Sequence, residues 1–353
     1  AGGTYLPIAV DFPSHRKQLL LGQVSVQILL ANLSDVDELN LSGVTVLSPS
    51  TLVDWHAEPS FFPVLAQSDQ LAYTLFTSGS TGIPKGVMIS HASVCNTVMD
   101  INQRFGVTSE DVIFGVSALT FDLSAYDIWG ALVAGATLVL PSDSEVRDPA
   151  AWWRYLVDYD VTIWNSAPAL MSMLVLEADV QQAPLPSSLR YIMMSGDWVP
   201  PSLCRQLQAL TDGCHLVSLG GATEASIWSI YYPIDDVPES WTSIPYGYPL
   251  ANQSMHILDN DCYPCPDGVV GEIYIGGLGV ARGYLDDEER TQAQFVTLPA
   301  IGRVYRTGDM GLFRDGLIEF KGRQDNQIQL QGHRIELGEI EHVLNQHEEV
   351  REA

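Results

Sequence analysis

The feature that most constrains the fold of this sequence is the alternation of short apolar runs with amphipathic segments up to about residue 220. The apolar runs cover residues 26–30, 45–47, 71–76, 136–140, 161–165 and 189–194. Helix-like segments, such as residues 90–105 and 149–157, lie between them. Buried strands that alternate with helices are typical of parallel sheets with covering helices. We therefore expect an α/β protein.

The pattern changes near Gly247, where shorter apolar runs are separated by glycine and Asn/Asp turns. Runs at residues 255–258, 271–275 and 317–320, the last of them after the turn-like Arg314-Asp315-Gly316, predict an antiparallel or barrel-like piece. After Arg323 we expect a strand at residues 327–330, a turn at Gly332 and a helix that begins near Glu336. The chain is thus predicted to divide into residues 1–324 and 325–353.

Charge and composition exclude several classes of protein. The chain has 353 residues, 46% of them hydrophobic, and 17 Lys+Arg against 43 Asp+Glu, for a net charge of -26. That charge disfavours nucleic acid and anionic membranes as partners, because both are bound by clustered basic residues. No apolar run reaches the ~20 residues of a membrane-spanning helix, and no signal peptide is evident.

The five cysteines are an odd number in a long chain, which indicates a reduced, cytoplasmic protein. Cys262 and Cys265 form a C-x-x-C without a second pair of Cys or His at zinc-finger spacing. We interpret that segment as a structural loop rather than as a metal or redox site.

A glycine-rich loop at residues 77–86 follows the apolar run at 71–76 and ends in Ile83-Pro84-Lys85-Gly86. Glycines let the backbone approach a ligand closely, and hydroxyl and N–H groups can donate to phosphate oxygens. Lys85 adds a positive charge. The order differs from G-x-x-x-x-G-K-[ST], because no Ser or Thr follows Lys85. We predict a phosphate site; the alternative is a Ser/Gly surface turn.

The loop and six further motifs, in the same order, resemble adenylation domains of nonribosomal peptide synthetases, which are adenylate-forming ligases. Residues 1–8 resemble A-G-x-x-Y-x-P-I/L, and residues 121–124 resemble F-D-x-S. Residues 220–224 stand in place of Y-G-P-T-E, and residues 271–285 resemble G-E-L-x-I-x-G-x-G-V-A-R-G-Y-L. Residues 305–309 read Y-R-T-G-D, and residues 322–341 resemble the hinge motif.

The resemblance covers essentially the whole chain and implies the adenylate-forming ligase fold. A large N-terminal subdomain would hold two βαβ-type sheets and a small β-barrel, followed by the start of a small α+β C-terminal subdomain. The family's first segment and its final catalytic lysine have no counterpart between Ala1 and Ala353. The resemblance therefore implies a fragment of a longer enzyme.

The family joins a carboxylate to the α-phosphate of ATP and releases pyrophosphate, and the resemblance assigns roles to residues here. Lys85 and the loop would hold the phosphates, Thr223 would contact phosphate, and Glu224 would bind Mg²⁺. Asp309 would accept the ribose hydroxyls, Arg323 would reach the ribose or phosphate, and Asp325 would be the hinge. The nucleotide-binding set is completed by Thr77, Ser78, Gly79, Ser80, Thr81, Gly82, Gly220, Gly221 and Ala222.

Two positions depart from the family pattern. Gly220 stands where the family has a tyrosine that stacks on adenine, a replacement that a subset of these domains shares. Gln329 and Gln331 stand where the hinge motif is usually basic, which puts any charge contact made there in doubt.

The substrate is expected to be an amino acid, because the residue in the position of Asp122 binds the substrate's ammonium group in this family. An ammonium buried in a pocket requires an anionic partner. The other residues implied to line the pocket are Leu123, Tyr126, Asn165, Met193, Ser195, Leu219, Ile227 and Trp228. With Asp122 they resemble the cysteine-selective pattern, departing from it at Met193.

We therefore expect activation of L-cysteine, with serine, alanine and 2-aminobutyrate as near competitors. Transfer to the phosphopantetheine thiol of a carrier domain would follow, in nonribosomal peptide synthesis, and the resemblance implies a thiazoline siderophore as the product class. Two alternatives are a free-standing adenylate-forming ligase and a non-catalytic scaffold. The presence of Lys85, Glu224 and Asp309 argues against the scaffold.

Overall fold

The computed structural model describes residues 2–36, 39, 41–49, 65–79, 83–324, 327–330, 333–337, 340–341, 344 and 350. Its first segment contains α1 (Ser14–Gly22), β1 (Ile28–Leu30), the short 3-10 helix η1 (Leu33–Asp35) and β2 (Thr45–Leu47). The strands β1 and β2 pair in parallel. Each of the six apolar runs predicted from the sequence overlaps a strand.

A three-stranded sheet contains the glycine-rich loop. It has the order β14 (Gly283–Tyr284), β4 (Lys85–Ser90), β3 (Leu71–Thr77), and both pairings are antiparallel. This differs from the parallel arrangement that we expect for the first 220 residues. The connection between β3 and β4 is too short for the crossover that parallel neighbours require, so the two strands form a hairpin.

The main sheet has seven strands. They are β5 (Val112–Gly115), β6 (Thr137–Val139), β7 (Ile163–Ser166), β8 (Tyr191–Met194), β9 (His215–Gly220), β10 (Ile230–Ile234) and β11 (Tyr248–Pro249). Their order is β11-β10-β9-β8-β7-β5-β6. The pairs from β6 to β9 are parallel, as predicted, whereas β10 and β11 add antiparallel strands at one edge.

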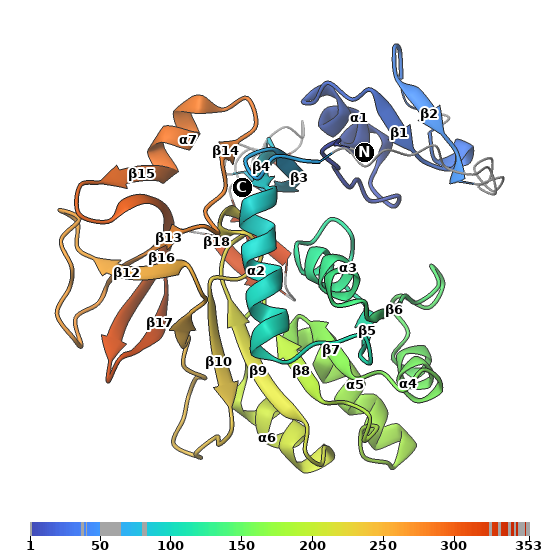
Figure 1. Ribbon diagram of the computed structural model, residues 1–353, viewed down its shortest axis with the longest axis vertical. Helices are drawn as coiled ribbons and strands as arrows, with labels where there is room; N and C mark the ends of the chain where they lie inside the picture. Colours follow the sequence, from blue (N-terminus) through green and yellow to red (C-terminus); the bar gives the residue numbers. More distant parts are fainter. Residues whose placement is uncertain are drawn as a thin grey trace.

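Helices cover both faces of this sheet (Figure 1). The helices α2 (His91–Arg104) and α3 (Leu123–Ala134) share one buried cluster with the sheet residues Ile113, Ile163 and Met193. A second cluster joins the other face to the helices α4 (Pro149–Asp158), α5 (Pro168–Gln181) and α6 (Pro201–Leu210). Alternate strand residues point to opposite faces, so these strands are apolar on both sides.

A separate antiparallel sheet forms the piece predicted after Gly247. It consists of β12 (Gln253–Leu258), β13 (Gly271–Gly277), β16 (Gly302–Arg314), β15 (Phe295–Leu298) and β17 (Leu317–Arg323), with α7 (Glu288–Gln294) before β15. The predicted turn joins β16 to β17. Asp315 and Gly316 both have positive φ, at 52° and 79°, as a two-residue hairpin turn requires.

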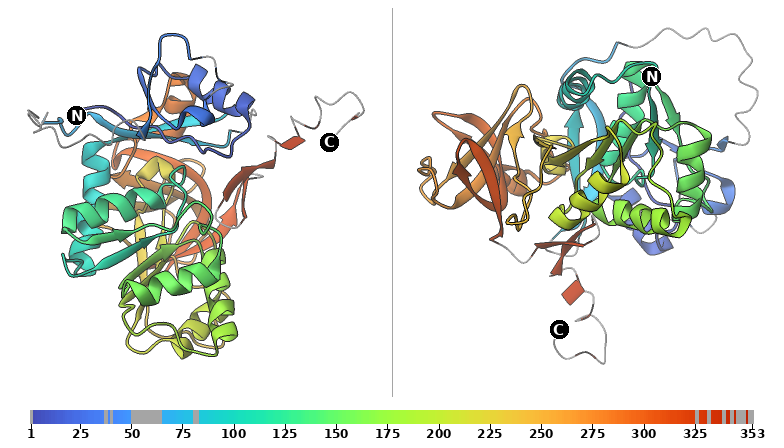
Figure 2. Two further views of the ribbon diagram at one scale, coloured as in Figure 1. Left: turned by 90° about the vertical axis from the view of Figure 1, so that its right-hand side faces the viewer. Right: turned by 90° about the horizontal axis from the view of Figure 1, so that it is seen from below.

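The strands β18 (Gln327–Leu330) and β19 (His333–Glu336) form an antiparallel hairpin, and Figure 2 shows this end of the chain apart from the main sheets. The strand predicted at 327–330 is confirmed. The turn at Gly332 and most of the helix expected from Glu336 lie outside the described residues. Within the described ranges, none of the helices has the length and apolar character needed to cross a membrane.

Candidate active site

The glycine-rich loop connects two strands that pair at its base, where Thr77 of β3 lies opposite Lys85 of β4. The hydroxyl of Thr77 is buried and has no hydrogen-bond partner among the described residues. A Cβ on Gly79 would lie 2.1 Å from the carbonyl oxygen of Ile83, so only glycine fits there. Ser78 lies between Thr77 and Gly79, whereas Ser80, Thr81 and Gly82 lie outside the described residues.

Lys85 forms a buried ion pair with Glu224, with 3.3 Å between Nζ and Oε1. Glu224 lies on the 3-10 helix η3 (Thr223–Ala225), which follows β9. The hydroxyl of Tyr284 on β14 donates to the same oxygen at 2.9 Å, and Lys85 Nζ lies 5.1 Å from the centre of the Tyr284 ring. The site thus holds a cation and a carboxylate together at the base of the phosphate loop. Tyr284 was not singled out from the sequence, although it lies within the R-G-Y-L motif.

Glu224 is the residue that could hold a metal ion. The described residues contain no group of three or more Asp, Glu, His or Cys side chains that could form an all-protein metal cage. Mg²⁺ is usually bound by one or two carboxylates together with substrate phosphates and water. A single buried carboxylate at a phosphate loop therefore fits Mg²⁺ brought in with a nucleotide.

Asp122 connects the predicted phosphate side of the site to the predicted amino-acid side. It precedes α3, is buried, and accepts a hydrogen bond from the Thr223 hydroxyl at 2.7 Å. Burial raises the pKa of Asp122 to about 6; the Thr223 hydrogen bond opposes this rise and the charge of Glu224 adds to it. A cationic ligand beside Asp122 would favour its ionised form.

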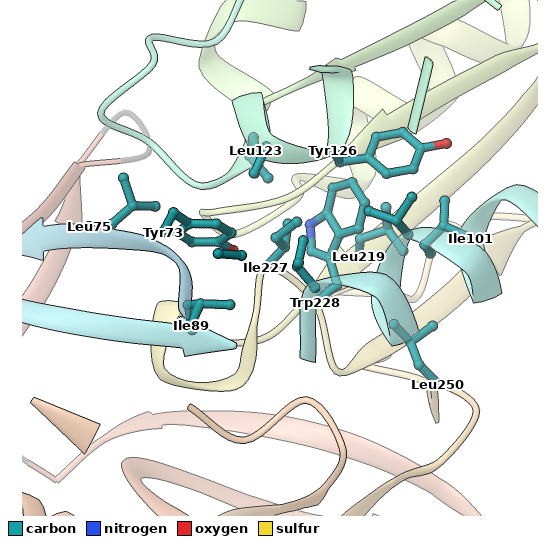
Figure 3. Close-up of a cluster of buried hydrophobic side chains, with 14 of the residues drawn as sticks. Tyr73, Leu75, Ile89, Ile101, Leu123, Tyr126, Leu219, Ile227, Trp228 and Leu250 are labelled. Atoms are coloured by element: carbon teal, nitrogen blue, oxygen red, sulfur yellow. The ribbon is translucent and has the colours of Figure 1, made fainter. Parts of the chain in front are cut away.

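Figure 3 shows predicted pocket residues in one buried cluster: Leu123, Tyr126, Leu219, Ile227 and Trp228. The Tyr126 and Trp228 rings are 5.0 Å apart, and Trp228 Nε1 donates to Ser195 Oγ at 2.9 Å. All of these residues are buried and come from α3, from the ends of β7, β8 and β9, and from the segment after η3: Leu123, Tyr126, Asn165, Met193, Ser195, Leu219, Ile227 and Trp228.

The segment that carries Trp228 has an unusual backbone. Ser226 and Ile227 both have positive φ, at 63° and 72°, which is rare for a β-branched residue such as Ile227. The Trp228 N–H donates to the Ser226 carbonyl at 2.9 Å, and the Ser229 N–H donates to the Gly220 carbonyl at 2.8 Å. Backbone strain of this kind is often found at ligand sites.

Asn165 is held by a second buried acid that the sequence reasoning missed, Asp127 on α3. Asn165 Nδ2 donates to Asp127 Oδ1 at 2.8 Å and to the Leu123 carbonyl at 3.4 Å. Among the described residues, Asn165 Oδ1 and Asp127 Oδ2 have no partner. Burial raises the pKa of Asp127 to about 8, against a smaller opposing effect of the Asn165 hydrogen bond.

Asp309 and Arg323 lie opposite each other on β16 and β17. The Arg323 guanidinium donates to Asp309 and, at 3.2 Å, to the carbonyl of Thr307. Gly220 ends β9, and Gly221 and Ala222 join it to η3. Asp325 and Gln331 lie outside the described residues, and Gln329 lies on β18 opposite Arg334.

Comparison with known proteins gives a consistent result. A family model described as AMP-binding enzyme matches residues 1–285. The chain is 44% identical over 356 residues to pyochelin synthetase PchF of Pseudomonas aeruginosa, covering 100% of this chain and 19% of that protein. It is 43% identical over 355 residues to bacitracin synthase 1 of Bacillus licheniformis, covering 100% of this chain and 6% of that protein.

The solved structures include the nonribosomal peptide synthetase FmoA3 (S1046A) in an α-methyl-L-serine-AMP bound form. It matches with a TM-score of 0.86 and 42% identity, covering 96% of this chain and 37% of that one. The chain also aligns with the anguibactin system regulator of Vibrio anguillarum, at 44% identity over 354 residues, 98% of this chain and 33% of that protein. It therefore spans a third or less of the length of these curated relatives.

Proposed function

The chain belongs to the AMP-binding enzyme family, as an adenylation domain of the nonribosomal peptide synthetase type, and from this premise we propose that it activates an amino acid with ATP. The products would be an aminoacyl adenylate and pyrophosphate. One observation carries the proposal: the Asp122–Thr223 hydrogen bond connects the carboxylate that would bind the substrate ammonium directly to the element that bears Glu224.

The chemical difficulty is that an anionic carboxylate must attack a polyanion. Lys85 would lie against the phosphates at the base of the glycine-rich loop, where its ion pair with Glu224 holds it now. Asp122 would bind the substrate ammonium and so orient the carboxylate toward the α-phosphate. Mg²⁺ held by Glu224 would neutralise phosphate charge. Asp309 would accept the two ribose hydroxyls, since an ionised carboxylate is purely an acceptor.

We propose L-cysteine as the substrate. The lining side chains carry no charge apart from Asp122, and most of them are large and apolar, which favours a short uncharged side chain. Ser195 accepts from Trp228, so its hydroxyl hydrogen can donate, while Asn165 Oδ1 can accept. One donor and one acceptor match a thiol or hydroxyl. A structure that resembles this chain binds α-methyl-L-serine-AMP, which also has a short polar side chain.

The activated amino acid would then pass to the phosphopantetheine thiol of a peptidyl carrier domain in the same polypeptide, in the cytoplasm. The product class that the resemblance implies is a nonribosomal peptide, for which a thiazoline siderophore is our candidate. The magnesium ion, the carrier domain and the product are all parts of this proposal.

ATP–pyrophosphate exchange in the natural full-length polypeptide tests the function. We expect exchange with L-cysteine, and weaker exchange with serine, alanine and 2-aminobutyrate. Asp309→Asn should raise the KM for ATP, whereas Asp315→Asn, at the far turn of the same hairpin, should leave it unchanged. Exchange with a different amino acid but not cysteine would refute the substrate, and absence of exchange with every amino acid would favour the scaffold.

A further inference from the structure

The position of Gly220 is filled by the side chain of another residue, Tyr246. A Cβ built on Gly220 would lie 2.0 Å from Cε2 and 2.8 Å from Cζ of the Tyr246 ring. No side chain can therefore be added at Gly220 while Tyr246 keeps its place. The Tyr246 ring thus occupies the space in which a side chain at Gly220, the last residue of β9, would begin. Tyr246 itself belongs to the segment before β11.

The backbone around Tyr246 is held on two sides. Its N–H donates to the carbonyl of Ile318 on β17 at 2.9 Å. The next residue, Gly247, has φ of 110°, and a Cβ there would lie 2.1 Å from the carbonyl oxygen of Tyr231 on β10. Tyr246 is therefore wedged between the main sheet and the antiparallel sheet, at a point where only glycine can follow it.

The Tyr246 ring is half-buried. Burial raises the pKa of its hydroxyl, and the negative charge of Asp309 raises it further, while the Gly221 backbone and Arg323 act in the opposite direction. The strand β17, which Tyr246 contacts at Ile318, also carries Arg323 opposite Asp309 of the predicted ribose site. The Phe320 ring, 5.9 Å away and tilted, packs beside it.

We propose that Tyr246 supplies the aromatic surface on which the adenine ring of ATP packs, in place of the side chain that Gly220 lacks. This inference rests on the ATP-dependent function proposed above. An aromatic ring packed against the hairpin that carries Asp309 is within reach of a purine on the same nucleotide. A purine stacks on any aromatic face, and such stacking typically changes affinity by about five- to a hundredfold. The hydroxyl is not needed for stacking.

The test compares single substitutions in the natural full-length polypeptide. Tyr246→Leu keeps apolar bulk without an aromatic face, and we expect the KM for ATP to rise by about tenfold with the KM for the amino acid unchanged. Tyr246→Phe keeps the face and should bind ATP like the wild type. Inorganic tripolyphosphate, which has no base, should inhibit wild type and Tyr246→Leu equally.

Exchanging the aromatic residue between the two positions gives a second test that does not depend on Tyr246→Leu folding well. Gly220→Tyr alone should lose ATP binding, because the new side chain and Tyr246 would occupy the same space. Gly220→Tyr combined with Tyr246→Ile should recover most of it. Direct binding of a non-hydrolysable ATP analogue measures this without catalysis.

The proposal is overturned if Tyr246→Leu weakens ATP and tripolyphosphate alike, if it raises both KM values equally, or if it leaves the KM for ATP unchanged. It is also overturned if the double variant folds but binds no better than Gly220→Tyr. A wild type that binds no nucleotide would refute the proposed function itself. A wild type that binds ATP, together with a Tyr246→Leu variant that binds it equally well, would refute only the role of Tyr246.

Discussion

Two aspartates of this site have pKa values that burial raises above the ordinary range of a carboxyl group. Asp122 directly precedes α3 and Asp127 lies on it, and burial raises the pKa of each, to about 6 and about 8. Asp122 has the hydroxyl of Thr223 beside it and would ionise to bind an ammonium group. Asp127 has only the Asn165 amide as a hydrogen-bond partner within the described part of the chain, and it is neutral at pH 7. At pH 7, Asp122 is therefore mostly ionised and Asp127 mostly protonated.

For Asp122 we predict a pH-dependent affinity for the amino acid. Only the ionised carboxylate attracts ammonium, so kcat/KM for the amino acid should fall by up to about tenfold per pH unit once the pH drops below about 6. The KM for ATP, measured at saturating amino acid, should change less. Asp122→Asn should be poor at all pH values and lack this fall. A wild-type profile that is flat from pH 7 to pH 5 would contradict the assignment.

For Asp127 we predict a pH-dependent stability. The folded state holds the proton up to about pH 8, whereas an unfolded aspartate loses it near pH 4. The folded state therefore binds more protons between these values, and stability falls as the pH rises through this window. Asp127→Asn is neutral throughout, so relative to wild type it should gain on the order of 1 kcal/mol per pH unit.

Hydrogen exchange of α3 in wild type and Asp127→Asn, at pH 5 and pH 8 with correction for the intrinsic rate, measures this difference. The nearby ionisable groups are Tyr126 on the same helix and the Asp111–Arg190 ion pair before β5 and β8. Both are present in wild type and variant, so their titration cancels in the comparison. Equal pH dependence of the two proteins would show that Asp127 is ionised in the folded state.

At the scale of elements, the hairpin of β16 and β17 carries the predicted ribose site at its base, because Asp309 and Arg323 are opposite each other. Its other end is the Asp315–Gly316 turn, which the sequence predicted from Arg314-Asp315-Gly316 and the structure confirms. Turn chemistry of this kind is local, so it can be read from neighbouring residues. The β3–β4 hairpin was not predicted. The alternating pattern favoured parallel strands, and the pairing of β3 with β4 depends on how the chain turns back through the glycine-rich loop.

We predict that Gly316→Ala destabilises this hairpin by about 1–2 kcal/mol, because an L-residue is strained at its φ of 79°. A Cβ there meets nothing within 4 Å, so crowding does not contribute. Gly3→Ala is the matched control: it also adds a methyl group in open space, but without a positive φ. Hydrogen exchange of β16 and β17 should accelerate in the first variant alone. Acceleration in both would contradict the backbone explanation.

At the scale of the whole molecule, the sequence predicted the α/β class and the strands β6, β7 and β8 of the main sheet, and the family resemblance implied the set of pocket residues. Those predictions rest on short-range patterns and on motifs whose spacing marks Lys85, Glu224 and Asp309. It did not predict Asp127 or Tyr246 as site residues. Each acquires its role from a partner distant in sequence, Asn165 for one and Gly220 for the other, and only the folded chain brings these partners together.

The Lys85–Glu224 ion pair joins two separate sheets. Substitutions at this pair can therefore test whether the same two residues contribute to both stability and activity. Lys85 belongs to the three-stranded sheet, Glu224 follows the main sheet, and Tyr284 contacts both. Lys85→Met would leave Glu224 buried without its cation, a change that typically costs about 3–5 kcal/mol. Glu224→Gln added to Lys85→Met removes the buried charge, so much of that stability should return.

Activity should not return with stability, because the double variant lacks both the cation proposed to bind phosphate and the carboxylate proposed to bind the metal ion. Thermal unfolding and ATP–pyrophosphate exchange of wild type, both single variants and the double variant measure the two quantities separately. Lys17→Met on α1 is the control for loss of a lysine outside the site. If the double variant were as unstable as Lys85→Met, the ion pair would not account for the loss. If it regained exchange, neither group would be needed for the reaction.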